Sequence, residues 1–295
     1  MACPQPTYWD YFVSGGTAGK YTVGTRDVKD PVQGSFLLNC SFIAVLASLA
    51  WKKTIPALKN HTINLELTEP YTFTFYGNAD TPTQKTNGTL PLDANRKLLH
   101  AKSDTDTIEI WPALWEKAYY QWLDNLPKET DKPNYCLHTE WQSPVTLMFQ
   151  LTGRIPFQKI SNGSTTLNAT AAFSEIDSWC SGCPIATYRT IKSPAVAWSY
   201  DPLVANPAKV QFSSDTVGPQ HTYSLLGVAA KKYIVLRNPY GSGKKEPDPT
   251  LVSLYNADAL WCSNSINLVN KTDGIFAISK DEFVKYFEGY AWMPL

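Results

Sequence analysis

Residues 31 to 53, PVQGSFLLNCSFIAVLASLAWKK, place a lone cysteine at the start of an almost wholly apolar segment. From Cys40 onward to residue 53, apolar side chains leave almost no polar face, which is the pattern of a helix buried on most sides. The amide dipoles at a helix N-terminus stabilise an anion, so this position favours a thiolate. Cys40 is therefore a candidate nucleophile. A buried inert cysteine or one half of a disulfide would fit the same position.

The composition narrows the class of protein. The chain has 295 residues, 43% of them hydrophobic, which is enough for one large domain or two smaller ones with a packed core. Lys plus Arg and Asp plus Glu each number 26, and nucleic acid binding needs a positive excess. No apolar run approaches the roughly 20 residues of a membrane-spanning helix. We expect neither a nucleic acid partner nor a membrane span.

The cysteines leave the disulfide pattern open. They are Cys3, Cys40, Cys136, Cys180, Cys183 and Cys262. Six cysteines permit three bridges in a secreted protein, but a nucleophilic Cys40 leaves at least one of the other five unpaired. The CSGC motif at 180–183 has no second cysteine pair beside it, so we expect a disulfide or two plain thiols there in preference to zinc.

Features of the sequence favour a secretory origin slightly over a cytoplasmic one. Charged residues make up only 18% of the chain. Asn-X-Ser/Thr motifs begin at Asn39, Asn60, Asn87, Asn162, Asn168 and Asn270. A glycan on Asn39 would obstruct the neighbouring Cys40. The first residues, MACPQPTYWDYF, lack the charged start and apolar stretch of a signal peptide.

Hydrophobic periodicity predicts a helical half followed by a β-rich half. Helices are expected at 40–53, 108–126 and 143–153, with Pro112 in the first turn of the second and Gly153 ending the third. Residues 63–78 alternate as two strands or a hairpin. The small polar residues of 159–175 predict a crossover. Beyond it, strands are expected at 183–191, 195–200, 221–230, 232–241 and 274–279, and a helix at 280–290.

This order predicts an α+β fold with two parts. The first, 1–165, is helical and carries Gln33 and Cys40, and the second, 166–295, is β-rich and carries His221 and Asn238. His221 opens an alternating strand, so its imidazole could face the thiol as a base. Asn238, where the next strand enters a turn, could orient that imidazole, and Gln33 with the Cys40 amide could stabilise an oxyanion. A turn asparagine and a solvated loop glutamine are the structural alternatives.

Four blocks of sequence, in order, carry a family resemblance. They are VQGSFLLNCSFIAVLASLA (32–50), TLPLDANRKLLHAKSDTDTIEIWPALWEKAYYQWL (89–123), HTYSLLGVAAKKYIVLRNPYG (221–241) and DGIFAISKDEFVKYF (273–287). Together they resemble the protease core of the calpain branch of the papain-like cysteine proteases. The resemblance implies a papain-like fold of two lobes, with a peptide or protein substrate in the cleft between them. It covers the protease core only, and we expect a monomer.

By this resemblance the chain is an endopeptidase that acts through an acyl-enzyme thioester. Cys40 would be the nucleophile, His221 the general base and acid, Asn238 the orienting residue and Gln33 the oxyanion donor. The chain departs from the family pattern at three positions. Ser41 replaces an aromatic residue, Gln33 lies seven positions before the cysteine instead of six, and Tyr240 replaces a tryptophan.

The resemblance also raises calcium, with no other cofactor implied. Asp30 and Glu116 match the acidic ligands of the family's first calcium site. At the second site Asp273 is kept, but Ile275 stands where an acidic ligand is expected. A loop aspartate and a helical glutamate are more often simply solvated.

Two further functions remain open from the sequence. The same three catalytic groups could transfer the acyl group to an amine instead of water, which would give ligation or cyclisation. A non-catalytic binding module could keep the scaffold while the site drifts, and Ser41 and the shifted Gln33 favour that reading. Retention of Cys40, His221 and Asn238 together speaks against such drift.

Overall fold

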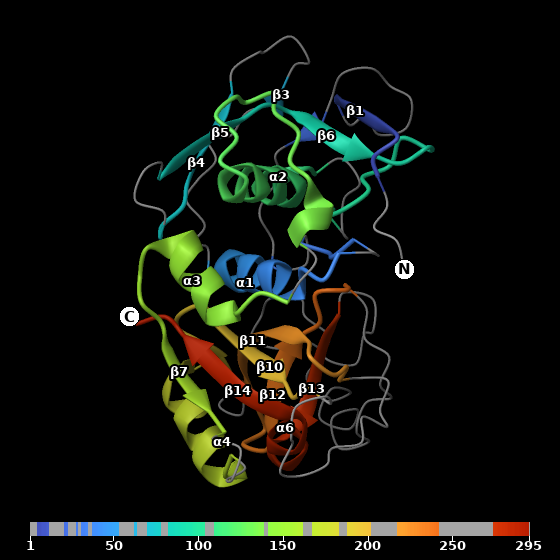
Figure 1. Cartoon of the computed structure of the whole chain (residues 1–295). Helices are drawn as coiled ribbons and strands as arrows, with labels where there is room; N and C mark the ends of the chain where they lie inside the picture. Colours follow the sequence, from blue (N-terminus) through green and yellow to red (C-terminus); the bar gives the residue numbers. More distant parts are fainter. Residues whose placement is uncertain are drawn as a thin grey trace. The chain divides into compact units, whose positions relative to one another are not determined.

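The computed structural model describes residues 5–11, 21–22, 28, 31–34, 37–52, 62–63, 70–77, 82–103, 109–138, 141–161, 167–182, 188–201, 217–241 and 274–294. The chain divides into two compact units, Met1–Arg154 and Ile155–Leu295, whose elements are labelled in Figure 1. The division falls N-terminal to the crossover expected at 159–175, because β7 (Phe157–Ile160) already pairs with a strand of the second unit. Helices and strands are mixed, which confirms the α+β prediction.

The first unit contains three α-helices and three antiparallel strand pairs among its described residues (Figure 1). The helices are α1 (Cys40–Trp51), α2 (Trp111–Leu123) and α3 (Pro144–Thr152), and a short 3-10 helix, η2, spans Tyr135–His138. The strand pairs are β1 (Tyr8–Tyr11) with β6 (Thr89–Leu92), β2 (Tyr21–Thr22) with β3 (Thr62–Ile63), and β4 (Tyr71–Thr74) with β5 (Thr83–Thr86).

The helices of this unit follow their sequence signals. Every residue of α1 except Trp51 is buried, as the apolar pattern predicts. Pro112 lies in the first turn of α2, where its missing N–H leaves no hydrogen bond unmade. Gly153 ends α3 in the left-handed conformation, with φ 71°, and its N–H donates to the Phe149 carbonyl at 2.7 Å. These helix predictions are confirmed.

Aromatic side chains fill the core between α1, α2 and the β4 segment. Phe42 stacks on Tyr119 with ring centroids 4.9 Å apart, and Phe75 meets the edge of Tyr119 at 5.6 Å. Phe73 contacts Trp115 edge to face at 4.9 Å. Such pairs stabilise a core by more than the burial of their apolar area alone. They hold α1, and with it Cys40, in a fixed position within the first unit.

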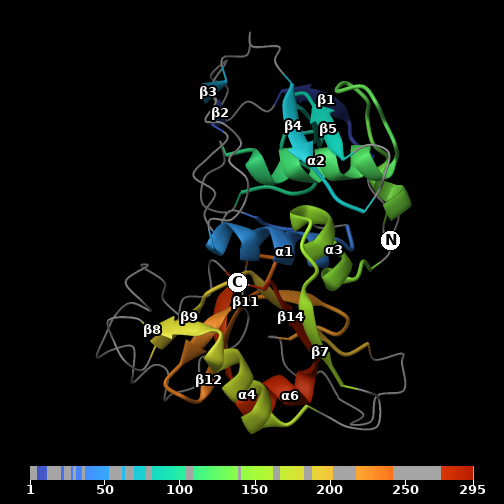
Figure 2. The same ribbon diagram turned by 90° about the vertical axis from the view of Figure 1, so that its left-hand side faces the viewer.

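An antiparallel sheet of eight strands forms the second unit. Its order is β13-β12-β11-β10-β14-β7, and β9 joins β11 and carries β8 at its outer side. The strands are β8 (Cys180–Gly182), β9 (Tyr188–Ile191), β10 (Ala195–Ser199), β11 (Thr222–Ala229), β12 (Tyr233–Arg237), β13 (Ile275–Ser279) and β14 (Phe287–Trp292). Two helices, α4 (Ala169–Ser178) and α6 (Lys280–Tyr286), pack against each other and against this sheet (Figure 2).

Two segments of this unit differ from their predictions. The expected crossover contains the end of β7 and most of α4, which begins where the Asn168 side chain accepts the Ala171 N–H. The helix predicted to run to residue 290 ends at Tyr286, and the chain continues as β14. Pairing with both β10 and β7 overrides the helical spacing of the apolar residues there.

No helix among the described residues combines the length and the apolar character that a membrane crossing requires.

Candidate active site

Cys40 is the first residue of α1 in the first unit, and its side chain is 4% exposed. The residue before it, Asn39, accepts the Ile43 N–H at 3.1 Å through its carbonyl and so begins the helix. The Asn39 side chain makes no cap hydrogen bond. Its Nδ2 instead donates to Glu116 Oε1 at 2.5 Å. The sulfur therefore lies at the positive end of a buried helix, the position that lowers a thiol's cost of ionising.

Glu116, on α2, holds the segment that leads into Cys40. Its Oε1 accepts from Asn39, and its Oε2 accepts the Ala101 backbone N–H at 3.0 Å. Burial raises the pKa of the Glu116 carboxyl to about 8, although both hydrogen bonds act in the opposite direction. The protonated form therefore prevails at neutral pH. Through Asn39, this carboxyl group fixes the residue adjacent to the candidate nucleophile.

Gln33 lies in the loop before α1 and is 5% exposed. One N–H of its side-chain amide donates to the Leu37 carbonyl. Its Oε1 has no hydrogen-bond partner in the described structure. The bond to Leu37 brings Gln33 close to a residue four positions later in the chain. This contact shortens the path from Gln33 to Cys40, where the chain has one residue more than the family pattern. The second N–H of the same amide remains able to donate elsewhere.

Backbone contacts hold the loop that contains Gln33 against the segment around residue 100. Val32 exchanges two backbone hydrogen bonds with Lys102, at 2.9 and 3.1 Å. A Cβ on Gly34 would lie 2.6 Å from the His100 Cα, so only glycine fits this approach. Backbone contacts with residues 100–102 thus fix the loop that carries the candidate oxyanion donor.

His221 and Asn238 come together in the second unit, as the sequence predicts. His221 immediately precedes β11 and Asn238 immediately follows β12, and these two strands pair with Ser224 opposite Arg237. The His221 Nε2 lies 3.1 Å from the Asn238 Oδ1. An amide oxygen only accepts, so Nε2 carries the proton and Nδ1 keeps its lone pair. The imidazole is thereby held in the tautomer that can take a proton at Nδ1.

Aromatic rings enclose this imidazole. Tyr240 stacks on it with ring centroids 4.9 Å apart and an interplanar angle of 11°, and Tyr223 meets it edge to face at 4.9 Å. His221 is 7% exposed. Burial lowers the pKa of His221 to about 4, and the hydrogen bond to Asn238 opposes this shift. The imidazole is consequently neutral, and able to act as a base, across the physiological pH range.

Backbone contacts that the sequence did not reveal hold the two residues in place. The Ser199 hydroxyl accepts the His221 N–H at 3.0 Å, and the Ser199 N–H donates to the His221 carbonyl at 2.9 Å. Asn238 donates its N–H to the Gly274 carbonyl at 2.9 Å. Gly274 has φ +75°, and a Cβ there would lie 2.7 Å from the Asn238 carbonyl oxygen. No spacing rule connects these residues in the sequence, because the sheet brings them together.

The described residues do not assemble a calcium site around Glu116. Both oxygens of its carboxyl group already accept N–H donors, and the side chain is 1% exposed. Within the described ranges, no group of three or more His, Cys, Asp or Glu side chains is placed to hold a metal ion. Asp30, the other expected ligand, lies outside those ranges, so calcium at Asp30 stays a prediction.

The cysteines take different chemical states. Cys136 is disulfide-bonded, whereas Cys40 and Cys180 are buried and reduced. Cys3, Cys183 and Cys262 lie outside the described residues, so the expected state of the CSGC pair is not described. Cys180 donates its S–H to the Ile176 carbonyl at 3.3 Å, the role of a structural thiol.

Each unit therefore contributes one pair of predicted site residues. Cys40 and Gln33 belong to the first unit, and His221 and Asn238 to the second. Sequence reasoning missed the contact between Asn39 and Glu116. It noted only a glycosylation motif at Asn39 and named Glu116 as a possible calcium ligand.

Comparison with known proteins agrees with this set of groups. The chain is 25% identical over 289 residues to a thiol protease of Porphyromonas gingivalis (strain ATCC BAA-308 / W83). The match covers 92% of this chain and 56% of that protein, so the chain spans about half the length of this curated relative. The sequence model of the calpain family cysteine proteases matches residues 17–291. The chain therefore belongs to the calpain family of cysteine proteases.

Proposed function

We propose that this chain is a papain-like cysteine endopeptidase whose two compact units are the two lobes, with a peptide bound between them. Cys40 is the nucleophile, His221 the general base and acid, and Asn238 the residue that orients the imidazole. Gln33 and the Cys40 backbone N–H stabilise the oxyanion. The family supports this assignment, and so does the local geometry within each unit.

The reaction begins with proton transfer from the Cys40 thiol to the Nδ1 lone pair of His221. The thiolate attacks the carbonyl carbon of the scissile peptide bond, and the carbonyl electrons move to the oxygen. The oxyanion collapses, the C–N bond breaks, and the imidazolium gives its proton to the leaving amine. Water, deprotonated by the same imidazole, then attacks the thioester, releases the acid product and restores the thiol.

The hydrogen bond between His221 and Asn238 carries the proposal. It assigns the Nε2 proton and leaves Nδ1 as the proton acceptor. Tyr240 stacks on the imidazole, which is buried, and a buried hydrogen bond is stronger than one in water. A binding module that had lost catalysis would have no use for a buried imidazole held in one tautomer. The observation therefore favours the enzyme over a drifted scaffold.

Alkylation of Cys40 combined with hydrolysis of a fluorogenic peptide library tests the proposal. We expect iodoacetamide at neutral pH to label Cys40 and abolish turnover. We expect Cys40→Ala to lower kcat/KM at least about 10³-fold, because the nucleophile acts as part of one unit with its base. Cys180→Ala is the matched control, since Cys180 is also buried and reduced and its S–H donates to the Ile176 carbonyl.

Asn238→Ala separates catalysis from folding in the same assay. Loss of the orienting oxygen should lower kcat by about 10–10² while alkylation of Cys40 is still observed. Turnover by Cys40→Ala at the wild-type rate would refute the proposal. So would equal labelling of Cys40 and Cys180 with no loss of turnover.

A further inference from the structure

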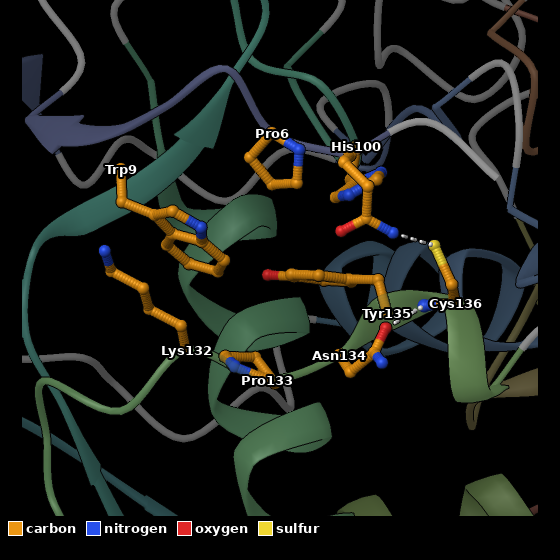
Figure 3. A pocket seen from close by; sticks show the side chains of 9 residues that line it. Pro6, Trp9, His100, Lys132, Pro133, Asn134, Tyr135 and Cys136 are labelled. Atoms are coloured by element: carbon orange, nitrogen blue, oxygen red, sulfur yellow. Dashed lines mark hydrogen bonds between the residues drawn. The ribbon is translucent and has the colours of Figure 1, made fainter.

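A pocket lies within the first unit, and its lining does not include Gln33 or Cys40. Its volume is about 170 Å³, comparable with a cavity of about 150 Å³ that accommodates a benzene ring. The residues that line it are Gln5, Pro6, Trp9, His100, Lys132, Pro133, Asn134, Tyr135 and Cys136. Figure 3 shows these side chains around a common space. The pocket is therefore large enough for one six-membered ring.

Flat rings form one part of the pocket wall. Trp9 stacks on Tyr135 with ring centroids 6.2 Å apart and an interplanar angle of 28°. The His100 ring lies over Tyr135 at 4.2 Å, and two prolines complete the lining. Tyr135 also packs against Leu37 and Tyr120 in a buried cluster, which fixes its ring. Rigid rings of this kind are the surface on which a planar ligand stacks.

Two side chains that line the pocket have buried polar atoms without a partner. His100 is 2% exposed and Tyr135 is 3% exposed. Both ring nitrogens of His100 and the Tyr135 hydroxyl lack hydrogen-bond partners in the described structure. Buried polar groups are nearly always paired in folded proteins, because leaving them unpaired costs free energy. Two such side chains lining the same pocket indicate that a ligand completes their hydrogen bonds.

The charged groups in the pocket lining indicate the charge of the ligand. Lys132 is the single side chain of fixed charge in the lining, and its Nζ lies 5.8 Å from the centre of the Trp9 ring. Burial lowers the pKa of His100 to about 4 and raises that of the Tyr135 hydroxyl, so both are neutral at pH 7. The lining contains no carboxylate. The pocket therefore suits an anion and disfavours a cation.

We propose that this pocket binds an aromatic ring that carries a carboxylate. The ring lies against Trp9 and Tyr135, and the carboxylate accepts from Lys132 and from the Tyr135 hydroxyl, which points toward Trp9 in Figure 3. A hydroxyl on the far side of the ring meets His100. Such a group occurs in a free aromatic acid and in the C-terminal aromatic residue of a peptide.

Titration of the full chain with 4-hydroxybenzoate, followed by calorimetry and ligand-observed NMR, tests the proposal. We expect saturable one-site binding, and at least about tenfold weaker binding for each of Tyr135→Phe, His100→Phe and Lys132→Gln. Lys128→Gln is the matched control, because Lys128 is exposed close by but does not line the pocket. Its affinity should equal that of the wild type.

A pair of tripeptides distinguishes the two sources. Gly-Gly-Tyr with a free carboxylate binds at least as tightly as 4-hydroxybenzoate if a peptide C-terminus is the natural ligand, and more weakly if a free acid is. Either result supports a site for an aromatic carboxylate. Equal binding of the C-terminal amide would overturn the role of the carboxylate and the proposal with it.

Thermal unfolding of the unliganded variants keeps the test independent of folding. Tyr135→Phe removes an unpaired hydroxyl and leaves the ring, so Tm should stay the same or rise while binding weakens. A lower Tm would mean that the hydroxyl is paired in the unliganded protein, which overturns the argument. Absence of saturation, or wild-type affinity in Lys132→Gln and Tyr135→Phe, would overturn it as well.

Discussion

Replacement of Glu116 by glutamine tests whether the carboxyl group that holds Asn39 is neutral in the folded protein. The amide has nearly the same shape and cannot ionise. Its oxygen can accept the Ala101 N–H that Glu116 accepts now. Its NH₂ group can donate to the Asn39 Oδ1, which has no partner in the described structure, once that amide turns over. Glu116→Gln thus keeps the contacts to both neighbours and removes only the titration.

The expected size of the effect follows from the pKa. Burial raises the pKa of Glu116 from 4.5 to about 8. A group whose folded pKa is raised contributes stability that is complete below its unfolded pKa and is lost as pH rises through the folded one. Each pH unit in that window is worth about 1.4 kcal/mol. Between pH 5 and pH 7.5 the wild type should therefore lose about 3 kcal/mol relative to Glu116→Gln.

Urea unfolding followed by tryptophan fluorescence, at several pH values between these limits, measures this difference. The two stability curves should converge at low pH, where the wild-type carboxyl is protonated in both states, and diverge as pH rises. Glu129→Gln is the control, because Glu129 lies in the same unit but is only half-buried. Parallel curves for Glu116→Gln and the wild type would refute the burial argument, and so would a wild type that gains stability relative to the variant.

The proposed chemistry makes further predictions. His221 must be neutral to accept the thiol proton, so the acid limb of kcat/KM should lie near pH 4, well below the 6.5 of an ordinary imidazole. Tyr240→Ala should move that limb upward, because it uncovers the ring, and an unmoved limb would exclude shielding by Tyr240. Gly274→Ala should cost about 1–3 kcal/mol of stability and lower kcat. Gly274 has φ +75°, which an alanine rarely adopts, and the added Cβ would lie too close to the Asn238 carbonyl oxygen. In the control Gly182→Ala the added Cβ has no atom within 4 Å, so neither the stability nor kcat should change.

Local signals in the sequence predicted the elements that carry the candidate site. The apolar run after Cys40 predicts a buried helix, and the structure gives one that begins at that residue. His221 and Asn238 flank two strands joined by a short turn, so their approach depends on one hairpin. Contacts of this kind are close in the sequence and need no knowledge of the rest of the fold. The catalytic roles themselves rest on the resemblance and stay proposals.

Elements decided by distant pairing were not predictable in the same way. Phe283, Tyr286, Phe287 and Tyr290 recur at helical spacing, which favoured a helix to residue 290. In the structure the last two belong to β14, which lies between β10 and β7. Two partner strands supply more hydrogen bonds than one further helical turn would, and neither partner is close in the sequence. The small, polar composition around α4 concealed a helix for a similar reason.

The α2 helix shows most clearly why the site could be predicted only in part. Its sequence, WPALWEKAYYQWL, is typical of an amphipathic helix with a solvated face, yet residues 111–122 are all buried. The polar side chains of this face donate hydrogen bonds to neighbouring loops instead of to solvent. Lys117 Nζ donates to the Asn87 Oδ1 at 2.6 Å and the Thr89 carbonyl at 2.9 Å, and Gln121 Nε2 donates to the Asp131 carbonyl at 2.7 Å.

Burial changes the pKa values of these polar groups and the free energy that their hydrogen bonds contribute. It lowers the pKa of Lys117 to about 7 and raises that of Glu116 to about 8, because each charge has left water. Breaking one of these contacts leaves a buried group unpaired, which costs more than a surface contact contributes. The loops before Cys40 and around Tyr135 are thus held from a single helix. Periodicity reports which faces are polar but not what covers them, so only the folded chain reveals this role of α2.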